Sequence, residues 1–119
     1  MARILVVDDD FETRAIIEKM LLSAGHEVIC AANGLEALQL CRAESADLVL
    51  TDLFMPEVDG IEAIQAIRRE FPNVKIIAMS GNPTATSMLS VARRLGTIAT
   101  LQKPFTEAEL VTVLKEVLR

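Results

Sequence analysis

The sequence contains no tryptophan or tyrosine, one histidine and two cysteines. Cys30 and Cys41 lack the spacing of a metal site, and we expect two free thiols in a reducing compartment rather than a disulfide. No stretch approaches the ~20 apolar residues of a membrane-spanning helix. The amino-terminal residues also lack the apolar segment and the cleavage site of a secretion signal. These absences predict a cytoplasmic protein with no membrane partner.

Basic charge is also scarce, since 17 acidic residues face 12 lysines and arginines and the net charge is −5. This balance argues against direct binding of nucleic acid by the chain and is compatible with a basic protein partner. The length of 119 residues fits one domain, and a hydrophobic content of 51% argues against disorder. We therefore expect a single domain spanning residues 1–119.

Short apolar runs alternate along the chain with helical patterns. Continuous apolar runs are typical of strands buried on both faces of a parallel sheet, and they cover residues 3–8, 27–31, 47–52, 75–80 and 98–102. Helical periodicity predicts five helices, at 11–24, 33–43, from 59 to about 71, 84–95 and from 106 onward. The alternation predicts a doubly wound α/β domain, with helices on both faces of a mostly parallel sheet.

Several helix ends carry recognisable caps. Asn33 and Asp59 are predicted N-caps, and Thr106 with Glu109 three residues later forms a capping box. The first helix should stop at Gly25. His26, which follows, is interpreted as an exposed turn residue rather than a metal ligand or phosphodonor.

Polar residues follow four of the five predicted strands. Asp8, Asp9 and Asp10 come after the first, Asp52 ends the third, Ser80 the fourth, and Lys103 follows the fifth. Ligands of open α/β sheets bind at the carboxyl ends of the strands, so these side chains should converge there. Asp10 is the exception, because its position favours a solvated or helix-capping role.

The chemistry open to such a set is limited. Converging carboxylates need a cation to remain ionised, and hard oxygen ligands favour Mg²⁺ or a similar ion such as Mn²⁺. A carboxylate such as Asp52 can also accept a phosphoryl group as an acyl phosphate. A metal ion and Lys103 would balance the phosphoryl charge, while the Ser80 hydroxyl and the Gly81 N–H could donate to its oxygens.

Four motifs in order, VVDDD, TDLFMPEVDG, AMSGN and LQKPF, resemble the receiver domains of two-component response regulators. The resemblance covers essentially the whole chain. It implies the flavodoxin-like (βα)5 fold with strand order 2-1-3-4-5. It also implies a cis bond before Pro104.

The resemblance implies a role for each residue at the strand ends. Asp52 corresponds to the phospho-acceptor, Ser80 to the switch hydroxyl and Lys103 to the phosphate-binding lysine. Metal ligation falls to Asp8, Asp9, Asp52 and the backbone carbonyl of Phe54, with Asp9 the more direct ligand of the acidic pair.

A sensor histidine kinase or a phosphotransfer protein is the implied phosphodonor. The surface of the fourth helix, fifth strand and fifth helix would then change its affinity for a downstream protein. The chain would act as a signalling module rather than an enzyme, with at most self-catalysed phosphorylation and slow autodephosphorylation. We expect a monomer or weak dimer, with no output domain within the 119 residues.

The sequence departs from the family pattern at Thr100, where the family usually carries an aromatic ring that changes rotamer with the switch. Phe54 and Asn82 flank the phosphate position, and only Asn82 could orient a water molecule. Thr100 leaves open a second hypothesis, a degenerate receiver that acts as a phosphorylation-independent scaffold. Two other classes fit less well. A phosphatase of the haloacid-dehalogenase type carries a second acid two residues after the nucleophile, where this sequence has Phe54. A flavodoxin carries a loop rich in hydroxyls and glycines after the first strand, where this sequence has the acidic DDDFET.

Overall fold

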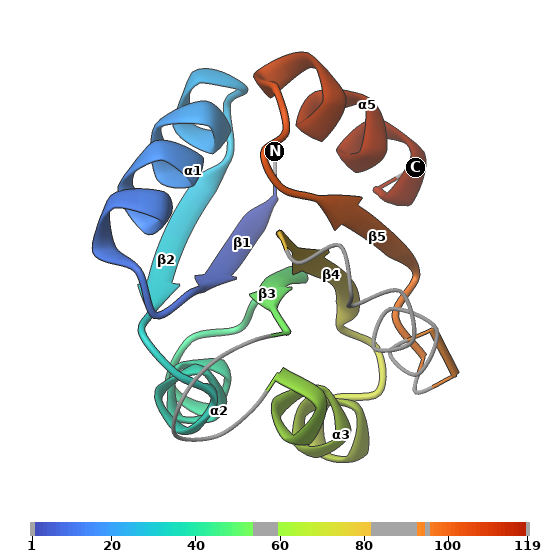
Figure 1. Ribbon diagram of the computed structural model, residues 1–119. Helices are drawn as coiled ribbons and strands as arrows, with labels where there is room; N and C mark the ends of the chain where they lie inside the picture. Colours follow the sequence, from blue (N-terminus) through green and yellow to red (C-terminus); the bar gives the residue numbers. More distant parts are fainter. Residues whose placement is uncertain (1, 54–59, 82–92, 95, 119) are drawn as a thin grey trace.

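The computed structural model of the chain describes residues 2–53, 60–81, 93–94 and 96–118. Its five parallel strands form one sheet in the order β2-β1-β3-β4-β5 (Figure 1). They are β1 (Arg3–Val7), β2 (Glu27–Ala31), β3 (Leu48–Asp52), β4 (Lys75–Ser80) and β5 (Ala99–Gln102). The predicted strand order is confirmed, and every predicted strand end lies within one residue of the observed one.

Within the described residues, two helices cover each face of the sheet. On one face lie α1 (Phe11–Ser23) and α5 (Glu107–Val117), and on the other α2 (Gly34–Ala43) and α3 (Gly60–Glu70) (Figure 1). Most of the predicted helix at 84–95 and the predicted cap Asp59 lie outside the described residues, although Arg93 and Arg94 are helical.

Alternating residues of each strand feed two separate cores. In β1, Ile4 and Val6 pack with residues of α1 and α5, whereas Leu5 and Val7 pack with residues of α2 and α3. This alternation is the period of two that a strand imposes on its side chains. A strand buried on both faces must be apolar throughout, which explains the continuous runs in the sequence.

Local capping fixes where the helices begin and end. Asp10 caps α1 by accepting a hydrogen bond from the Glu12 N–H, and Asn33 caps α2 by accepting one from Glu36. The capping box of Thr106 is present at α5. Gly25 has φ +89°, the left-handed conformation expected just after a helix. These predicted caps are confirmed, and the cap at Asp10 places Asp8 and Asp9 directly at the end of β1.

Two smaller expectations have different outcomes. Both cysteines are free, as predicted. The predicted exposure of His26 is wrong, because the residue is half-buried just before β2 and its Nδ1 accepts a hydrogen bond of 3.1 Å from the Ala2 N–H. This contact joins His26 to the residue just before β1, and the position after a glycine does not indicate it.

Candidate functional site

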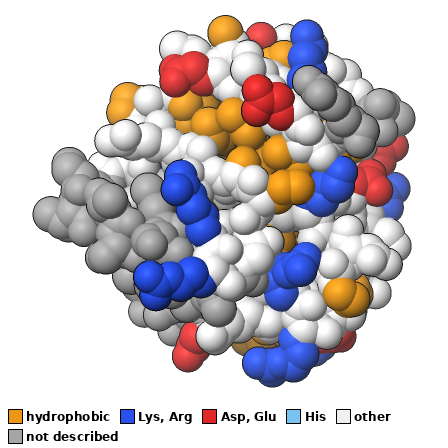
Figure 2. Space-filling view, turned by 90° about the vertical axis from the view of Figure 1, so that its right-hand side faces the viewer, with side chains coloured by type: hydrophobic (Ala, Val, Ile, Leu, Met, Phe, Trp, Pro, Cys, Tyr) orange, Lys and Arg blue, Asp and Glu red, His pale blue; other side chains and the backbone are white. Residues whose placement is uncertain are grey.

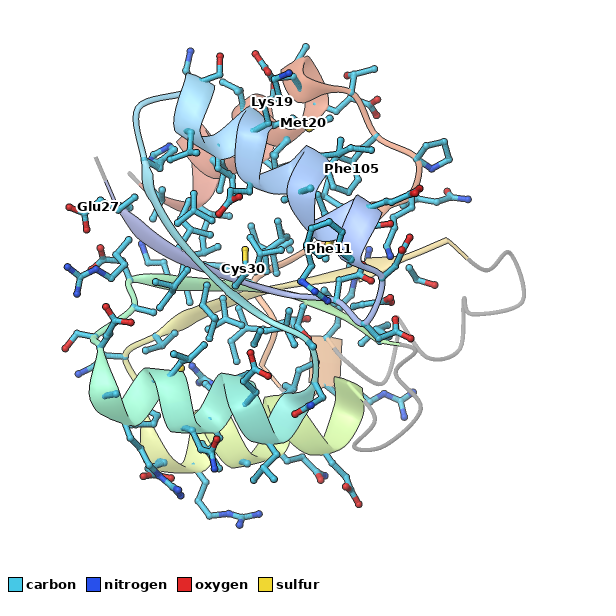
Figure 3. All side chains as sticks on the ribbon, turned by 90° about the vertical axis from the view of Figure 1, so that its left-hand side faces the viewer. Phe11, Lys19, Met20, Glu27, Cys30 and Phe105 are labelled. Atoms are coloured by element: carbon cyan, nitrogen blue, oxygen red, sulfur yellow. The ribbon has the colours of Figure 1, made fainter. Side chains whose placement is uncertain are left out.

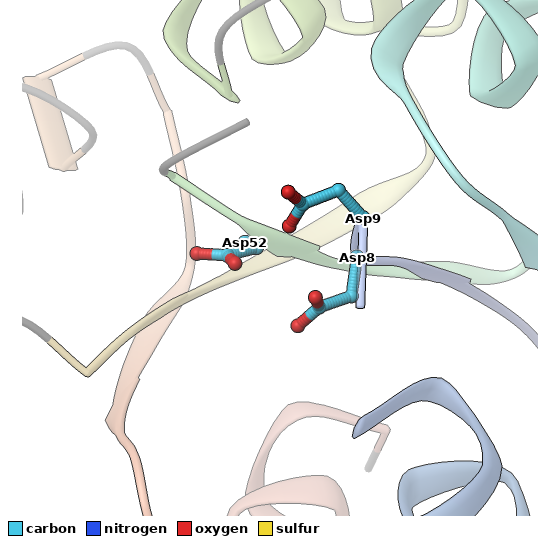
Figure 4. Close-up of side chains that lie close together, drawn as sticks. All are labelled: Asp8, Asp9 and Asp52. Atoms are coloured by element: carbon cyan, nitrogen blue, oxygen red, sulfur yellow. The ribbon is translucent and has the colours of Figure 1, made fainter. Parts of the chain in front are cut away.

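Three aspartates converge at the carboxyl ends of β1 and β3. The two strands are neighbours, with Val7 paired to Thr51, so the residues that follow lie at one edge of the sheet. Asp8 is 1% exposed and Asp52 6%, whereas Asp9 is exposed. One carboxylate oxygen from each lies within 4.8 Å of the others (Figure 4). Three hard oxygen donors at this spacing fit a divalent cation such as Mg²⁺, whose remaining positions water would fill.

Lys103 reaches the same point from the end of β5. Its Nζ lies 2.7 Å from Oδ2 of Asp8 and 3.1 Å from Oδ2 of Asp52. Burial alone would lower the pKa of Lys103, but the hydrogen bond to Asp8 and the charges of both carboxylates outweigh it and raise the pKa. The sequence predicted that Lys103 would converge with the acids, but not that its shorter contact would be with Asp8. The Lys103–Pro104 bond is cis, as the family resemblance implied.

Every polar atom of Asp8 has a partner. Its N–H donates to the carbonyl of Ala31, and its Oδ1 accepts a hydrogen bond of 2.9 Å from the Asp10 N–H. Its carbonyl oxygen accepts one of 2.7 Å from Nη1 of Arg14. Asp8 is therefore fixed in position before any ligand arrives.

Arg14 was missed by the sequence reasoning. Its guanidinium carbon lies 5.6 Å from the ring centroid of Phe11, which is a cation–π distance. Phe11 is the first residue of α1 and is labelled in Figure 3. A cation one turn into a helix that follows three acids is the signal that could have identified it. Arg14 ties α1 to the loop that carries Asp8 and Asp9.

Ser80 and Gly81 lie at the carboxyl end of β4, beside Lys103. Ser80 is 1% exposed, and its carbonyl accepts a hydrogen bond of 2.9 Å from the Lys103 N–H. A Cβ atom added at Gly81 would lie 3.4 Å from Cβ of Lys103, in van der Waals contact, so the two residues are close neighbours. Phe54 and Asn82, the other predicted neighbours of the phosphate, lie outside the described residues.

Thr100 is half-buried in β5, and its hydroxyl accepts a hydrogen bond of 3.3 Å from Nη2 of Arg93. A polar contact with the helical residue Arg93 therefore exists at the position where the family usually has a ring. Within the described ranges, no helix has both the length and the apolar character needed to cross a membrane.

The model of the family described as response regulator receiver domain matches residues 4–115. The chain belongs to this family. It is 32% identical over 116 residues to the sporulation initiation phosphotransferase F of Bacillus subtilis, covering 98% of this chain and 93% of that protein. The solved structure of the Vibrio cholerae chemotaxis protein CheY4 superposes with a TM-score of 0.92 at 30% identity, covering 98% of both chains.

Other relatives of this receiver domain are longer. The CpxR homolog of Haemophilus influenzae, a transcriptional regulatory protein, is 37% identical over 119 residues. That match covers 100% of this chain but 51% of the relative, so the chain spans about half the length of that protein. The match to the regulator NtrC of Azospirillum brasilense covers 24% of that protein's length.

Membership of the family defines the function class. Receiver domains are the phosphoryl-accepting signalling domains of two-component systems, and this chain is one of them. Receiver domains bind Mg²⁺ in an acidic pocket, and Asp8, Asp9 and Asp52 form such a pocket here. The scaffold hypothesis is not favoured, since acids, hydroxyl and lysine are all present at one edge of the sheet.

Proposed function

We propose that Asp52 accepts the phosphoryl group. The observation that carries this proposal is the placement of its carboxylate, within 4.8 Å of two other acids and 3.1 Å from the Lys103 ammonium. A carboxylate oxygen of Asp52 attacks the phosphorus of a phosphohistidine donor, the P–N bond breaks, and the departing imidazole takes up a proton. The product is an acyl phosphate on Asp52.

The metal site of this proposal consists of Asp9, Asp8, Asp52 and the carbonyl of Phe54, with Mg²⁺ or Mn²⁺ as the ion. When bound, the ion neutralises charge on the phosphoryl oxygens. Asp9 is the exposed member and the readiest direct ligand, because both oxygens of Asp8 already accept hydrogen bonds from Asp10 and Lys103.

Lys103, Ser80 and Gly81 bind the phosphoryl group in this proposal. The Lys103 ammonium, shared between Asp8 and Asp52, transfers its hydrogen bonds to a phosphoryl oxygen. The Ser80 hydroxyl and the Gly81 N–H donate to the others. Asn82 and Thr100 complete the switch, by orienting water near the phosphate and by relaying the change through β5.

The donor in this proposal is a sensor histidine kinase or a phosphotransfer protein, in the cytoplasm, where ATP-derived phosphodonors are made. Phosphorylation changes the surface of the fourth helix, β5 and α5, and a downstream protein reads that change. The domain turns over no separate substrate, beyond its own phosphorylation and slow dephosphorylation. The phosphoryl group can shift the equilibrium between the inactive and active conformations only by as much as its interaction free energy differs between them.

Intact mass after incubation with acetyl phosphate tests the acceptor. We expect one added phosphoryl group on the native chain with Mg²⁺ and none with a chelator. Asp52→Asn should abolish uptake. Asp47→Asn is the matched control. Asp47 lies just before β3, at the amino end of the strand that Asp52 closes, and its carboxylate accepts a hydrogen bond from the Arg3 N–H. Uptake by Asp52→Asn would contradict the assignment.

A further inference from the structure

Charge is unevenly distributed along the chain. Residues 71–106 contain no aspartate or glutamate, and their cations are Lys75, Arg93, Arg94 and Lys103. The whole chain nevertheless carries a net charge of −5. A segment of positive charge in an acidic protein creates a local positive potential that attracts anionic groups.

The fold brings another arginine to this segment. A Cβ atom placed on Gly96 would lie 2.9 Å from Nε of Arg68, which belongs to α3. The Gly96 N–H donates a hydrogen bond of 3.1 Å to the carbonyl of Arg93. Arg68 therefore lies beside the turn that follows Arg93 and Arg94, and we call these three arginines together with Ile98 the arginine surface.

The arginine surface is exposed to solvent, and its positive charges have no acidic partner among the described residues. Arg93 and Arg94 are exposed, and Ile98 is 53% exposed. Among the described residues, no carboxylate forms an ion pair with any of its three guanidiniums, and Arg68 donates instead to the carbonyl of Pro72. In Figure 2, which shows the side of the molecule that carries β5, Lys and Arg side chains gather over the middle and lower part. Asp and Glu lie mainly near the top and the rim.

We propose that the arginine surface binds an acidic segment of the downstream protein, with the exposed side chain of Ile98 as the apolar contact. The inference rests on the proposed function, in which a downstream protein reads this side of the domain. A second copy of the chain fits poorly, because an isologous contact centred here would bring arginines against arginines. Nucleic acid also fits poorly, because its affinity comes from many phosphate contacts and the rest of the chain is acidic.

The arginine surface is connected to the phosphorylation site through β5. Arg93 donates to the hydroxyl of Thr100, and Lys103 follows the same strand three residues later. A displacement of Lys103 toward a phosphoryl group on Asp52 can therefore reach Arg93 through the backbone of β5 and this one hydrogen bond. Phosphorylation should change the affinity of the arginine surface for its acidic partner.

Titration with a short synthetic peptide of glutamate and leucine, followed by amide shifts in NMR spectra, tests the inference. We expect saturable shifts at residues 93–100 that weaken as salt is added, and none with the same peptide carrying lysine for glutamate. Arg93→Glu and Arg94→Glu should each weaken binding about tenfold, since like charges replace attractive ones. Lys19→Glu, the same charge change on the exposed face of α1 (Figure 3), should leave affinity unchanged.

Four results would overturn the inference: no saturable binding of the acidic peptide, equal weakening by Lys19→Glu, tighter binding of duplex DNA than of the peptide, or self-association that Arg93→Glu abolishes. Acetyl phosphate should change the peptide affinity of the native chain and not of Asp52→Asn. If the native chain gains the phosphoryl mass but its affinity does not change, the connection through β5 is wrong while Asp52 remains the acceptor. If no mass is gained, the proposed function fails independently of peptide binding.

Discussion

Nζ of Lys103 lies 2.7 Å from Oδ2 of Asp8, which joins the residue after β5 to the residue after β1 across two intervening strands. The same ammonium also contacts Asp52, so one cation serves two nearly buried carboxylates. Buried carboxylates are costly without a partner. Lys103 is therefore part of the stability of the domain as well as of its chemistry.

Replacing Lys103 by methionine should separate these two roles. Without the ammonium, Asp8 and Asp52 face each other uncompensated, and the free energy of unfolding should fall by about 3 kcal/mol without metal. Mg²⁺ should recover much of that loss and bind more tightly than to the native chain, because no ammonium competes for the carboxylates. Urea unfolding with and without Mg²⁺ measures both effects.

Lys115→Met is the control for that experiment, since Lys115 is exposed on α5. Its unfolding free energy should change by less than about 0.5 kcal/mol. An equal loss in both variants would show that the ion pairs of Lys103 contribute nothing specific.

Arg14→Ala should weaken Mg²⁺ binding about tenfold, as the loss of a group that orients metal ligands commonly does. The guanidinium holds the Asp8 carbonyl, and without it the loop bearing Asp8 and Asp9 loses its tie to α1. Calorimetric titration with Mg²⁺ measures the change, and Lys19→Ala on the same helix is the control. An unchanged Mg²⁺ affinity would show that Arg14 does not orient the metal-binding residues Asp8 and Asp9.

His26 should make stability depend on pH. Burial lowers its pKa below the ordinary 6.5, so the unfolded chain binds the proton first. The contribution of neutral His26 to the free energy of unfolding is fully present above pH 6.5 and declines as the pH falls below that value. The hydrogen bond from the Ala2 N–H is lost when Nδ1 is protonated.

The native chain should therefore lose more unfolding free energy than His26→Gln between neutral and mildly acidic pH. The NMR titration of this one histidine gives its pKa directly. A value at or above 6.5 would contradict the account.

Thr106→Ala should lower the unfolding free energy by about 1 kcal/mol. The Thr106 hydroxyl accepts a hydrogen bond of 3.1 Å from the Glu109 N–H, and the Glu109 carboxylate accepts one of 3.0 Å from the Thr106 N–H. Thr106→Ser keeps the hydroxyl and should retain nearly all of the stability. Thermal unfolding compares the two, and equal losses would mean that the cap contributes little.

Much of the fold follows from local rules. The β1 run is apolar throughout because alternate residues enter different cores. Asn33 and Thr106 cap their helices because their side-chain oxygens accept hydrogen bonds from N–H groups that have no partner within the helix. The convergence of Asp8 and Asp52 follows equally, because parallel neighbours bring their carboxyl ends to one edge.

Contacts between distant side chains do not follow from local rules. The sequence places Lys103 near two acids, but which carboxylate is closer depends on the path of the chain after β5. The contacts of Arg14 with the Asp8 carbonyl and of Arg93 with Thr100 depend on long side chains with many rotamers. His26 likewise depends on where the chain terminus lies, which no periodicity encodes.

The central claim is that the acyl phosphate forms on Asp52, and borohydride trapping tests it most directly. Borohydride reduces an acyl phosphate of aspartate to homoserine, which peptide mass mapping can locate. After acetyl phosphate and Mg²⁺, the account predicts homoserine at residue 52 and unmodified aspartates at Asp8 and Asp9. Homoserine at position 8 or 9 would contradict this claim. So would a protein that gains the mass of a phosphoryl group but yields no homoserine on reduction.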